Sequence, residues 1–77
     1  MTRIYKLFKI NSNKEKLVKE FTTMQEATLK VRNLLGLKEF QKCEYIPIYD
    51  GVMQIGMIFT KEGKELFVIR KEIVWQD

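Results

Sequence analysis

Residues 45–71 read YIPIYDGVMQIGMIFTKEGKELFVIRK, and this stretch decides the fold. Apolar residues alternate with a period of two from Val52 to Phe59, which is typical of a half-buried strand. Asp50-Gly51 before it is typical of a two-residue hairpin turn, and Lys61-Glu62-Gly63 after it of a three-residue loop with a left-handed glycine. The stretch therefore predicts a three-stranded antiparallel sheet.

The two turns predict the register of these strands and the residues that share each face. The first turn places Tyr49 opposite Val52, and the second places Thr60 opposite Lys64. One face then carries the apolar set Ile46, Ile48, Met53, Ile55, Met57, Phe59, Phe67 and Ile69. The other face carries Tyr45, Pro47, Tyr49, Gln54, Ile58, Lys64, Leu66 and Arg70, with the Tyr45 ring covering Gly56. Because Pro47 lacks a backbone donor, its strand is expected at an edge or with a bulge.

The N-terminal part contains a strand and an ambiguous segment. Residues 3–10 are rich in β-branched and aromatic types, which favours a strand. Residues 11–22 fit a hairpin, in which residues 11–14 form the turn and Leu17 and Phe21 point inward. They also fit the first turns of one long helix, capped by Ser12. The capping box that begins at Thr23 favours the hairpin.

The pattern over 24–35 predicts a helix that ends at Gly36 in the left-handed conformation. Its apolar stripe of Met24, Ala27, Val31, Leu34 and Leu35 is expected on the Met53/Ile55/Met57/Phe59 face, with Leu29 pointing away. Residues 37–42 are expected to be a connector, and residues 72–77 to extend the last strand. The predicted fold is a single α+β domain over 1–77, in the order β-β-α-β-β-β, with one helix on one face.

Composition limits the core and the chemistry. A chain of 77 residues packs little more than one sheet and one helix, so a homodimer is an open alternative. There is no long apolar run and no charged-then-apolar leader, so a soluble cytoplasmic protein is expected. The lone Cys43 is expected to be a small buried apolar residue.

Catalytic chemistry is not expected. The chain has no histidine, which removes the commonest general base and the commonest metal ligand. Its four glycines are isolated, so no phosphate-binding loop is present, and its carboxylates lie mostly beside lysines. We therefore expect no enzyme activity, no metal and no cofactor.

Charge is distributed unevenly. Residues 1–42 hold ten Lys and Arg against four Glu, a net charge of +6, whereas residues 43–77 carry four Lys and Arg against six acidic residues, a net charge of −2. This asymmetry is compatible with an acidic partner.

Two binding surfaces follow, with different partners. The first is a protein-binding surface, typical of a small inhibitor or accessory protein such as phages and mobile elements encode; its residues are Tyr45, Tyr49, Gln54, Ile58, Lys64, Leu66, Arg70 and Trp75. The alternative is nucleic acid, bound either by the aromatic and basic residues of that sheet face or by the basic N-terminal half, with Arg3, Lys6, Lys9, Lys16, Lys19, Lys30 and Arg32. Protein binding is the first hypothesis, and no membrane contact is expected.

Overall fold

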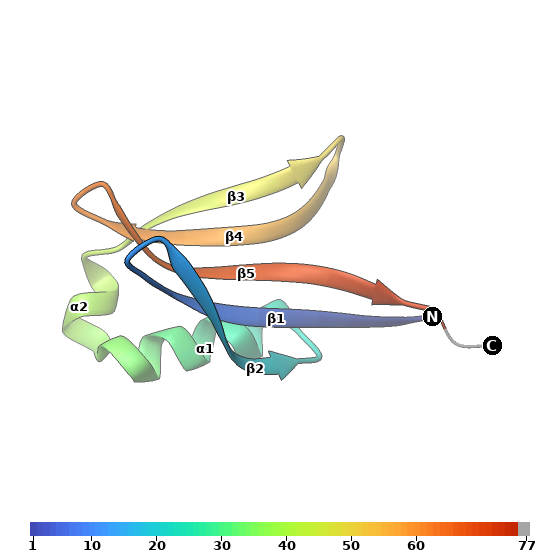
Figure 1. Ribbon diagram of the computed structural model, residues 1–77, viewed down its shortest axis with the longest axis horizontal. Coiled ribbons are helices and arrows are strands. Elements are labelled where there is room, and N and C mark those ends of the chain that lie inside the picture. The colour runs from blue at the N-terminus through green and yellow to red at the C-terminus, as the bar shows by residue number, and fades with distance from the viewer. Residues whose placement is uncertain (76–77) are drawn as a thin grey trace.

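A computed structural model of the chain describes residues 1–75. It has five antiparallel strands in the spatial order β2-β1-β5-β4-β3, with helices on one side (Figure 1). The elements are β1 (Thr2–Asn11), β2 (Lys14–Phe21), α1 (Met24–Leu35), α2 (Leu37–Gln41), β3 (Glu44–Asp50), β4 (Met53–Lys61) and β5 (Lys64–Val74). The predicted α+β class and the order β-β-α-β-β-β are confirmed, with α2 as an additional short helix in the expected connector.

The core lies between α1 and the helix side of the sheet. Thr23 caps α1, since its side-chain oxygen accepts a hydrogen bond from the Glu26 amide at 3.1 Å. The buried centre joins residues of β1, α1, β4 and β5: Leu7, Ala27, Val31, Phe59, Phe67 and Ile69. Leu29 points away as expected, but Leu34 is half exposed and does not belong to the buried stripe. Gly36 ends α1 at φ 84° and ψ 150°, an extended conformation with positive φ and not the left-handed helical one.

Residues 11–22 form the predicted hairpin. Ser12 and Asn13 both have positive φ, at 52° and 64°, as a two-residue type I′ turn requires. The ladder shifts by one residue at Val18, which packs toward the core. As a result Leu17 lies opposite Phe8, on the face away from the helix, and the prediction that Leu17 points inward is wrong.

The register predicted for β3 is wrong, and its faces are exchanged. The turn consists of Gly51 and Val52, with Asp50 opposite Met53, because Gly51 alone has the positive φ that a type II′ turn needs. A second shift between Ile48 and Tyr49 brings Tyr45 opposite Phe59. Tyr45 and Pro47 therefore lie on the helix side, and Ile46 and Ile48 on the outer face.

The β4–β5 turn is shorter than predicted. Glu62 and Gly63 form it with φ of 54° and 77°, so that Lys61 lies opposite Lys64. A further shift beside Thr60 then places Met57 opposite Ile69 and Arg70 opposite Gly56. Together, the shorter turn and this shift move the pairing of β4 with β5 by an even number of residues. Met57, Phe59, Phe67 and Ile69 therefore still share the helix side, and Arg70 still lies on the outer face.

Candidate functional site

The β3–β4 hairpin extends beyond the part of the sheet that the helices cover (Figure 1). Among the described strands, the backbone of α1 comes close only to β1, β2 and β5, and β4 reaches the core through Phe59. The expected packing of α1 on Met53 and Ile55 is therefore wrong: Met53 is exposed and Ile55 lies outside the core. We refer to residues 46–55, which no helix covers on either face, as the arm.

The arm is apolar and exposed. Val52 at its tip is fully exposed and Tyr49 is 58% exposed, while Ile46 and Met53 are about half exposed. Both faces of the arm thus carry exposed apolar side chains, since Tyr49 lies on the helix side and Ile46 on the outer face. Exposed apolar patches on soluble proteins often mark interaction sites. The arm is therefore the strongest candidate for a docking surface.

The total surface area points the same way. The chain exposes 5746 Å². A compact monomer of 9.2 kDa is expected to expose about 4,900 Å². The surplus of roughly 800 Å² reflects the elongated shape of the molecule, 42 × 25 × 23 Å, to which the uncovered arm contributes.

The chain segment that forms the arm contains acidic but no basic residues. Residues 43–60 contain Glu44 and Asp50 and no Lys or Arg, within a chain whose net charge is +4. The arm therefore has an acidic residue at its tip, Asp50, while Lys71 of β5 approaches its side, with 3.5 Å between the Lys71 Nζ and the Met53 Sδ.

The free edge of β3 is poorly suited to pair with another strand. Pro47 stands in the middle of this edge strand and removes one of its backbone donors. A partner is therefore expected to use the side-chain faces of the arm and not its backbone edge.

The predicted protein-binding residues are divided between the two faces. Tyr45 lies on the helix side in an aromatic cluster, 5.3 Å from the Phe59 ring at 84° and 5.6 Å from the Phe40 ring. Gly56 is covered by Ile48 and not by Tyr45. Leu66 packs against the core on the helix side. The placement of Tyr45 and Leu66 on the outer face is therefore corrected.

Tyr49 and Gln54 face each other across the arm, where the Gln54 side chain donates to the Gly56 carbonyl at 3.1 Å. Ile58 is half buried on the outer face between Ile46 and Val68. Trp75 is exposed just after the pairing of β5 with the start of β1. Tyr49 and Gln54 thus belong to the arm, but they lie on the same face as Pro47, the helix side, and not on the predicted outer face. Ile58 borders the arm, and Trp75 follows the end of β5.

Arg70 serves an internal role on the outer face. Its guanidinium reaches across β1, stacks over the Phe8 ring at 5.3 Å and forms a bidentate pair with Glu15 of β2. Hydrogen bonding to Arg70 lowers the pKa of the Glu15 carboxyl, and the same contact raises the pKa of Arg70. Arg70 is therefore already engaged and is a weak candidate for partner contact.

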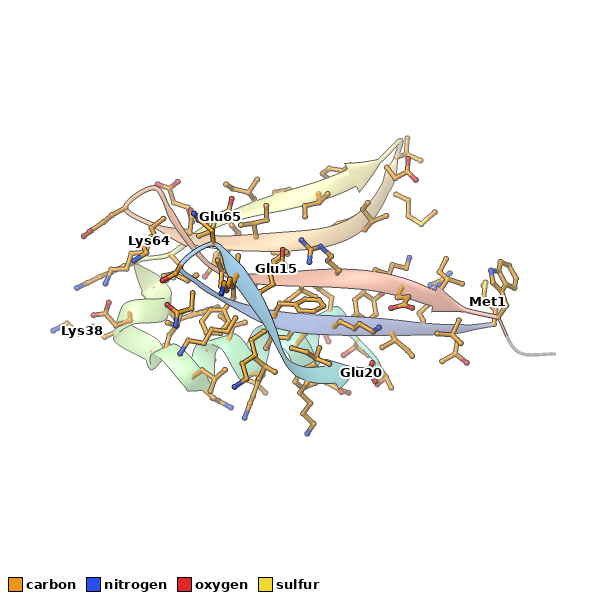
Figure 2. All side chains as sticks on the ribbon, viewed as in Figure 1. Met1, Glu15, Glu20, Lys38, Lys64 and Glu65 are labelled. Atoms are coloured by element: carbon orange, nitrogen blue, oxygen red, sulfur yellow. The ribbon has the colours of Figure 1, made fainter. Side chains whose placement is uncertain are left out.

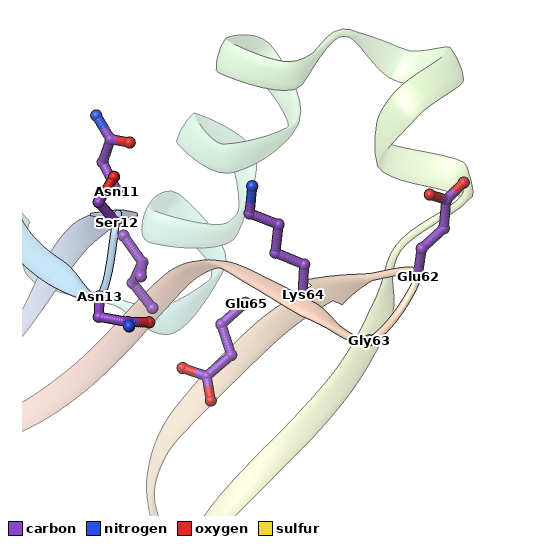
Figure 3. Close-up of a pocket in the computed structure, with 8 residues that line it drawn as sticks. Asn11, Ser12, Asn13, Glu62, Gly63, Lys64 and Glu65 are labelled. Carbon is purple, nitrogen blue, oxygen red and sulfur yellow. The ribbon is translucent and has the colours of Figure 1, made fainter.

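Lys64 borders a polar cleft of about 460 Å³ between the β1–β2 turn and the β4–β5 turn. Figure 3 shows Lys64 and Glu65 leaving β5 in different directions, opposite Asn11, Ser12 and Asn13. The cleft mixes one lysine with the carboxylates of Glu62 and Glu65, and across residues 1–75 no group of three or more metal-ligating side chains is found. It offers no defined chemistry.

The basic residues of the alternative hypothesis are also spread over several surfaces. Lys6 lies on the outer face and forms ion pairs with Glu72 at 2.6 Å and Glu20 at 3.8 Å. Hydrogen bonding to Glu72 raises the pKa of the Lys6 ammonium group. Arg3 lies near the start of β1, and Arg32 borders a groove with Met24 and Phe40. The rest, Lys9, Lys16, Lys19 and Lys30, lie along β1, β2 and α1 on the helix side.

The arm residues that sequence reasoning missed are Ile46, Val52 and Met53. Two of them were assigned to the covered face by the incorrect register, and Val52 was placed in a strand instead of the turn. Pro47, which marks an uncovered edge, is the signal that identifies their surroundings.

Cys43, before β3, is 8% exposed, and its burial raises the pKa of the thiol. This agrees with its predicted role as a small buried residue.

Comparison with known proteins gives no match: no family model, no curated protein sequence and no solved structure matches this chain. Within the described residues, no helix is long and apolar enough to span a membrane.

Proposed function

We propose that this protein is a non-enzymatic protein-binding module, of the accessory or inhibitory kind, and that the arm is its docking element. The observation that carries the proposal is an apolar hairpin that no helix covers on either face. Burying it on a partner removes apolar area from water at about 25 cal/mol per Å², before the costs of association.

The residue types of the arm suit a protein partner. Tyr49 is a large, rigid side chain of the kind that dominates measured interface energies, and Met53 adapts to irregular apolar surfaces. Val52, at the end of the arm, can enter a shallow pocket. Tyr49, Val52 and Met53 are thus the expected anchors.

The charge of the arm predicts the rim of the partner surface. Asp50 at the turn and Glu44 at the base of β3 have no basic neighbour within residues 43–60. We expect a partner with an apolar centre rimmed by Lys or Arg, since opposite charges at the rim steer association and select against other partners.

The test uses the variant Tyr49→Ala/Val52→Ser/Met53→Ser, whose positions are exposed in the folded protein. The wild type and the variant are each used to capture proteins from nuclease-treated lysate. A protein that the wild type captures and the variant does not is then purified, and its affinity for the wild type and for the variant is measured by calorimetry. We expect binding to weaken at least about 100-fold, with a negative heat-capacity change for the wild type.

The matched control is Leu29→Ser/Leu37→Ser, two half-exposed leucines on the helices. This variant should bind like the wild type. Equal affinity of the arm variant and the wild type for the purified protein would refute the role of the arm.

A further inference from the structure

The edge strand β2 separates its charges by face. Its register places Lys14, Lys16 and Lys19 on the helix side, opposite Asn11, Lys9 and Leu7. Glu15, Leu17 and Glu20 lie on the outer face, opposite Ile10, Phe8 and Lys6. The shift at Val18 is what keeps Lys16 and Lys19, three positions apart, on one face.

The two carboxylates of β2 neutralise groups of the outer face. Glu15 pairs with Arg70 of β5, and Glu20 lies 3.8 Å from Lys6 of β1. Figure 2 marks Glu15 and Glu20 toward opposite ends of β2. Glu15 is therefore occupied on the outer face, whereas Glu20 also borders the depression beside Lys19. On the helix side, Glu26 of α1 lines the depression that Lys19 and Lys30 share, whereas Lys9, Lys14 and Lys16 have no carboxylate partner within residues 1–75.

Two more lysines, Lys9 and Lys30, lie on the same side of the sheet. Lys9 is directly opposite Lys16 in the ladder, an arrangement of like charges that destabilises a sheet unless an anion is nearby. Lys30 of α1 lines the same depression as Lys19, together with Phe21 and Asn33. Within residues 1–75, no ion pair with a carboxylate is found for Lys9, Lys14, Lys16, Lys19 or Lys30.

We propose that this lysine row (Lys9, Lys14, Lys16, Lys19 and Lys30) binds the phosphate backbone of nucleic acid without reading its sequence. The site is distinct from the arm and extends the proposed function to a module that holds a protein and a nucleic acid on different surfaces. It includes Lys14, which the sequence-based set omitted, and excludes Arg3, Lys6 and Arg32 of that set.

The geometry of the row favours a linear polyanion. Lys14 and Lys16 are alternate residues of β2, about 6.6–6.8 Å apart, and Lys19 continues the same face of this edge strand beyond the shift at Val18, so three positive charges follow an edge that no other strand covers. Lysine ammonium groups act as flexible point charges that suit phosphate without specifying a base. The depression beside Lys19 is open and contains the carboxylates of Glu20 and Glu26, so it suits a backbone passing over it and not an enclosed free phosphate.

The experiment measures binding of the full chain to a fluorescent 30-nucleotide DNA, single-stranded and duplex, between 50 and 200 mM salt. With five phosphate contacts, the duplex affinity should fall about 500-fold over this range. The variant Lys16→Glu/Lys19→Glu should weaken binding at least about 30-fold at 50 mM and reduce the salt slope by about 2. The variant Lys16→Arg/Lys19→Arg should bind like the wild type, because the charges are kept.

The control is Arg3→Glu/Lys71→Glu, which changes the net charge equally near the other end of β1. A loss below about 3-fold in this variant supports the lysine row, whereas an equal loss in both charge-reversal variants shows a diffuse field and overturns the site. No DNA binding at 50 mM salt, or equal competition by poly-glutamate at matched charge, also overturns the proposal. The arm variant Tyr49→Ala/Val52→Ser/Met53→Ser should bind DNA normally, so failure of one proposal is distinguishable from failure of the other.

Discussion

The two hairpins at the edges of the sheet use the same supersecondary unit in opposite ways. The β1–β2 hairpin lies under α1, contributes Leu7 to the core and carries charged side chains along its free edge. The β3–β4 hairpin has no helix over its distal half, and its free edge carries one proline and no basic residue. The β1–β2 hairpin is thus stabilised by packing against the helix, whereas the distal half of the β3–β4 hairpin extends into solvent with its apolar side chains exposed.

The largest expected effect compares burial in the two regions. Phe59→Ala removes a fully buried ring beneath Phe40 and Tyr45 and should lower the free energy of unfolding by about 3–5 kcal/mol. Ile46→Ala in the arm should change it by less than about 1 kcal/mol, since that side chain remains half exposed in the folded state. Urea unfolding measures both. A comparable loss for Ile46→Ala would show that the arm is packed like the core.

The junction between arm and sheet should give an intermediate effect. A Cβ on Gly56 would lie 2.6 Å from the Ile69 carbonyl oxygen, a backbone atom that cannot move without displacing β5. Gly56→Ala should therefore destabilise the protein by about 1–3 kcal/mol. Gly56→Ala should also increase amide hydrogen exchange in the arm. Unchanged stability would mean that the arm is only loosely joined to β5.

The smallest effect concerns the ion pair that ties β2 to the centre of the sheet. The pKa of Glu15 is lowered in the folded state by Arg70, so the pair stabilises the fold above the ordinary carboxyl pKa of 4.5 and the contribution is lost as pH falls through the lower folded value. For a pair this exposed, the contribution should stay below about 1 kcal/mol.

Melting temperatures between pH 7 and pH 3 test this sign. Glu15→Gln should start lower at pH 7 and lose less on acidification than the wild type. A wild type and variant with parallel pH profiles would show that the Arg70 contact is energetically neutral.

Much of the fold could be predicted from local patterns. The cap at Thr23 locates the start of α1 and decides between hairpin and long helix, because it satisfies backbone donors at that position. The period-two pattern of β4 and β5 correctly identified Met57, Phe59, Phe67 and Ile69 as one face. These features depend on residues close together in the chain.

The parts that were mispredicted depend on distant contacts. Three shifts in the ladders, at Val18, at Ile48/Tyr49 and beside Thr60, each move the pairing by one residue. No local pattern announces them, because they are set by packing, as when Tyr45 turns to meet Phe40 of α2. The pairing of β3 with β4 differs from the predicted register by an odd number of residues, so the two faces of β3 are exchanged. For this reason Ile46 and Met53 were assigned to the core instead of to the candidate site.

The position of β5 has a consequence for how the chain folds. The fifth strand in sequence lies third in the sheet, between β1 and β4, and Thr2 pairs with Val74. Before β5 is synthesised, the two hairpins share no strand and the core lacks Phe67 and Ile69. Pairing β1 with β5 closes the longest loops in the chain, so folding should be slow for a protein of this size and should begin only after the ribosome has released β5.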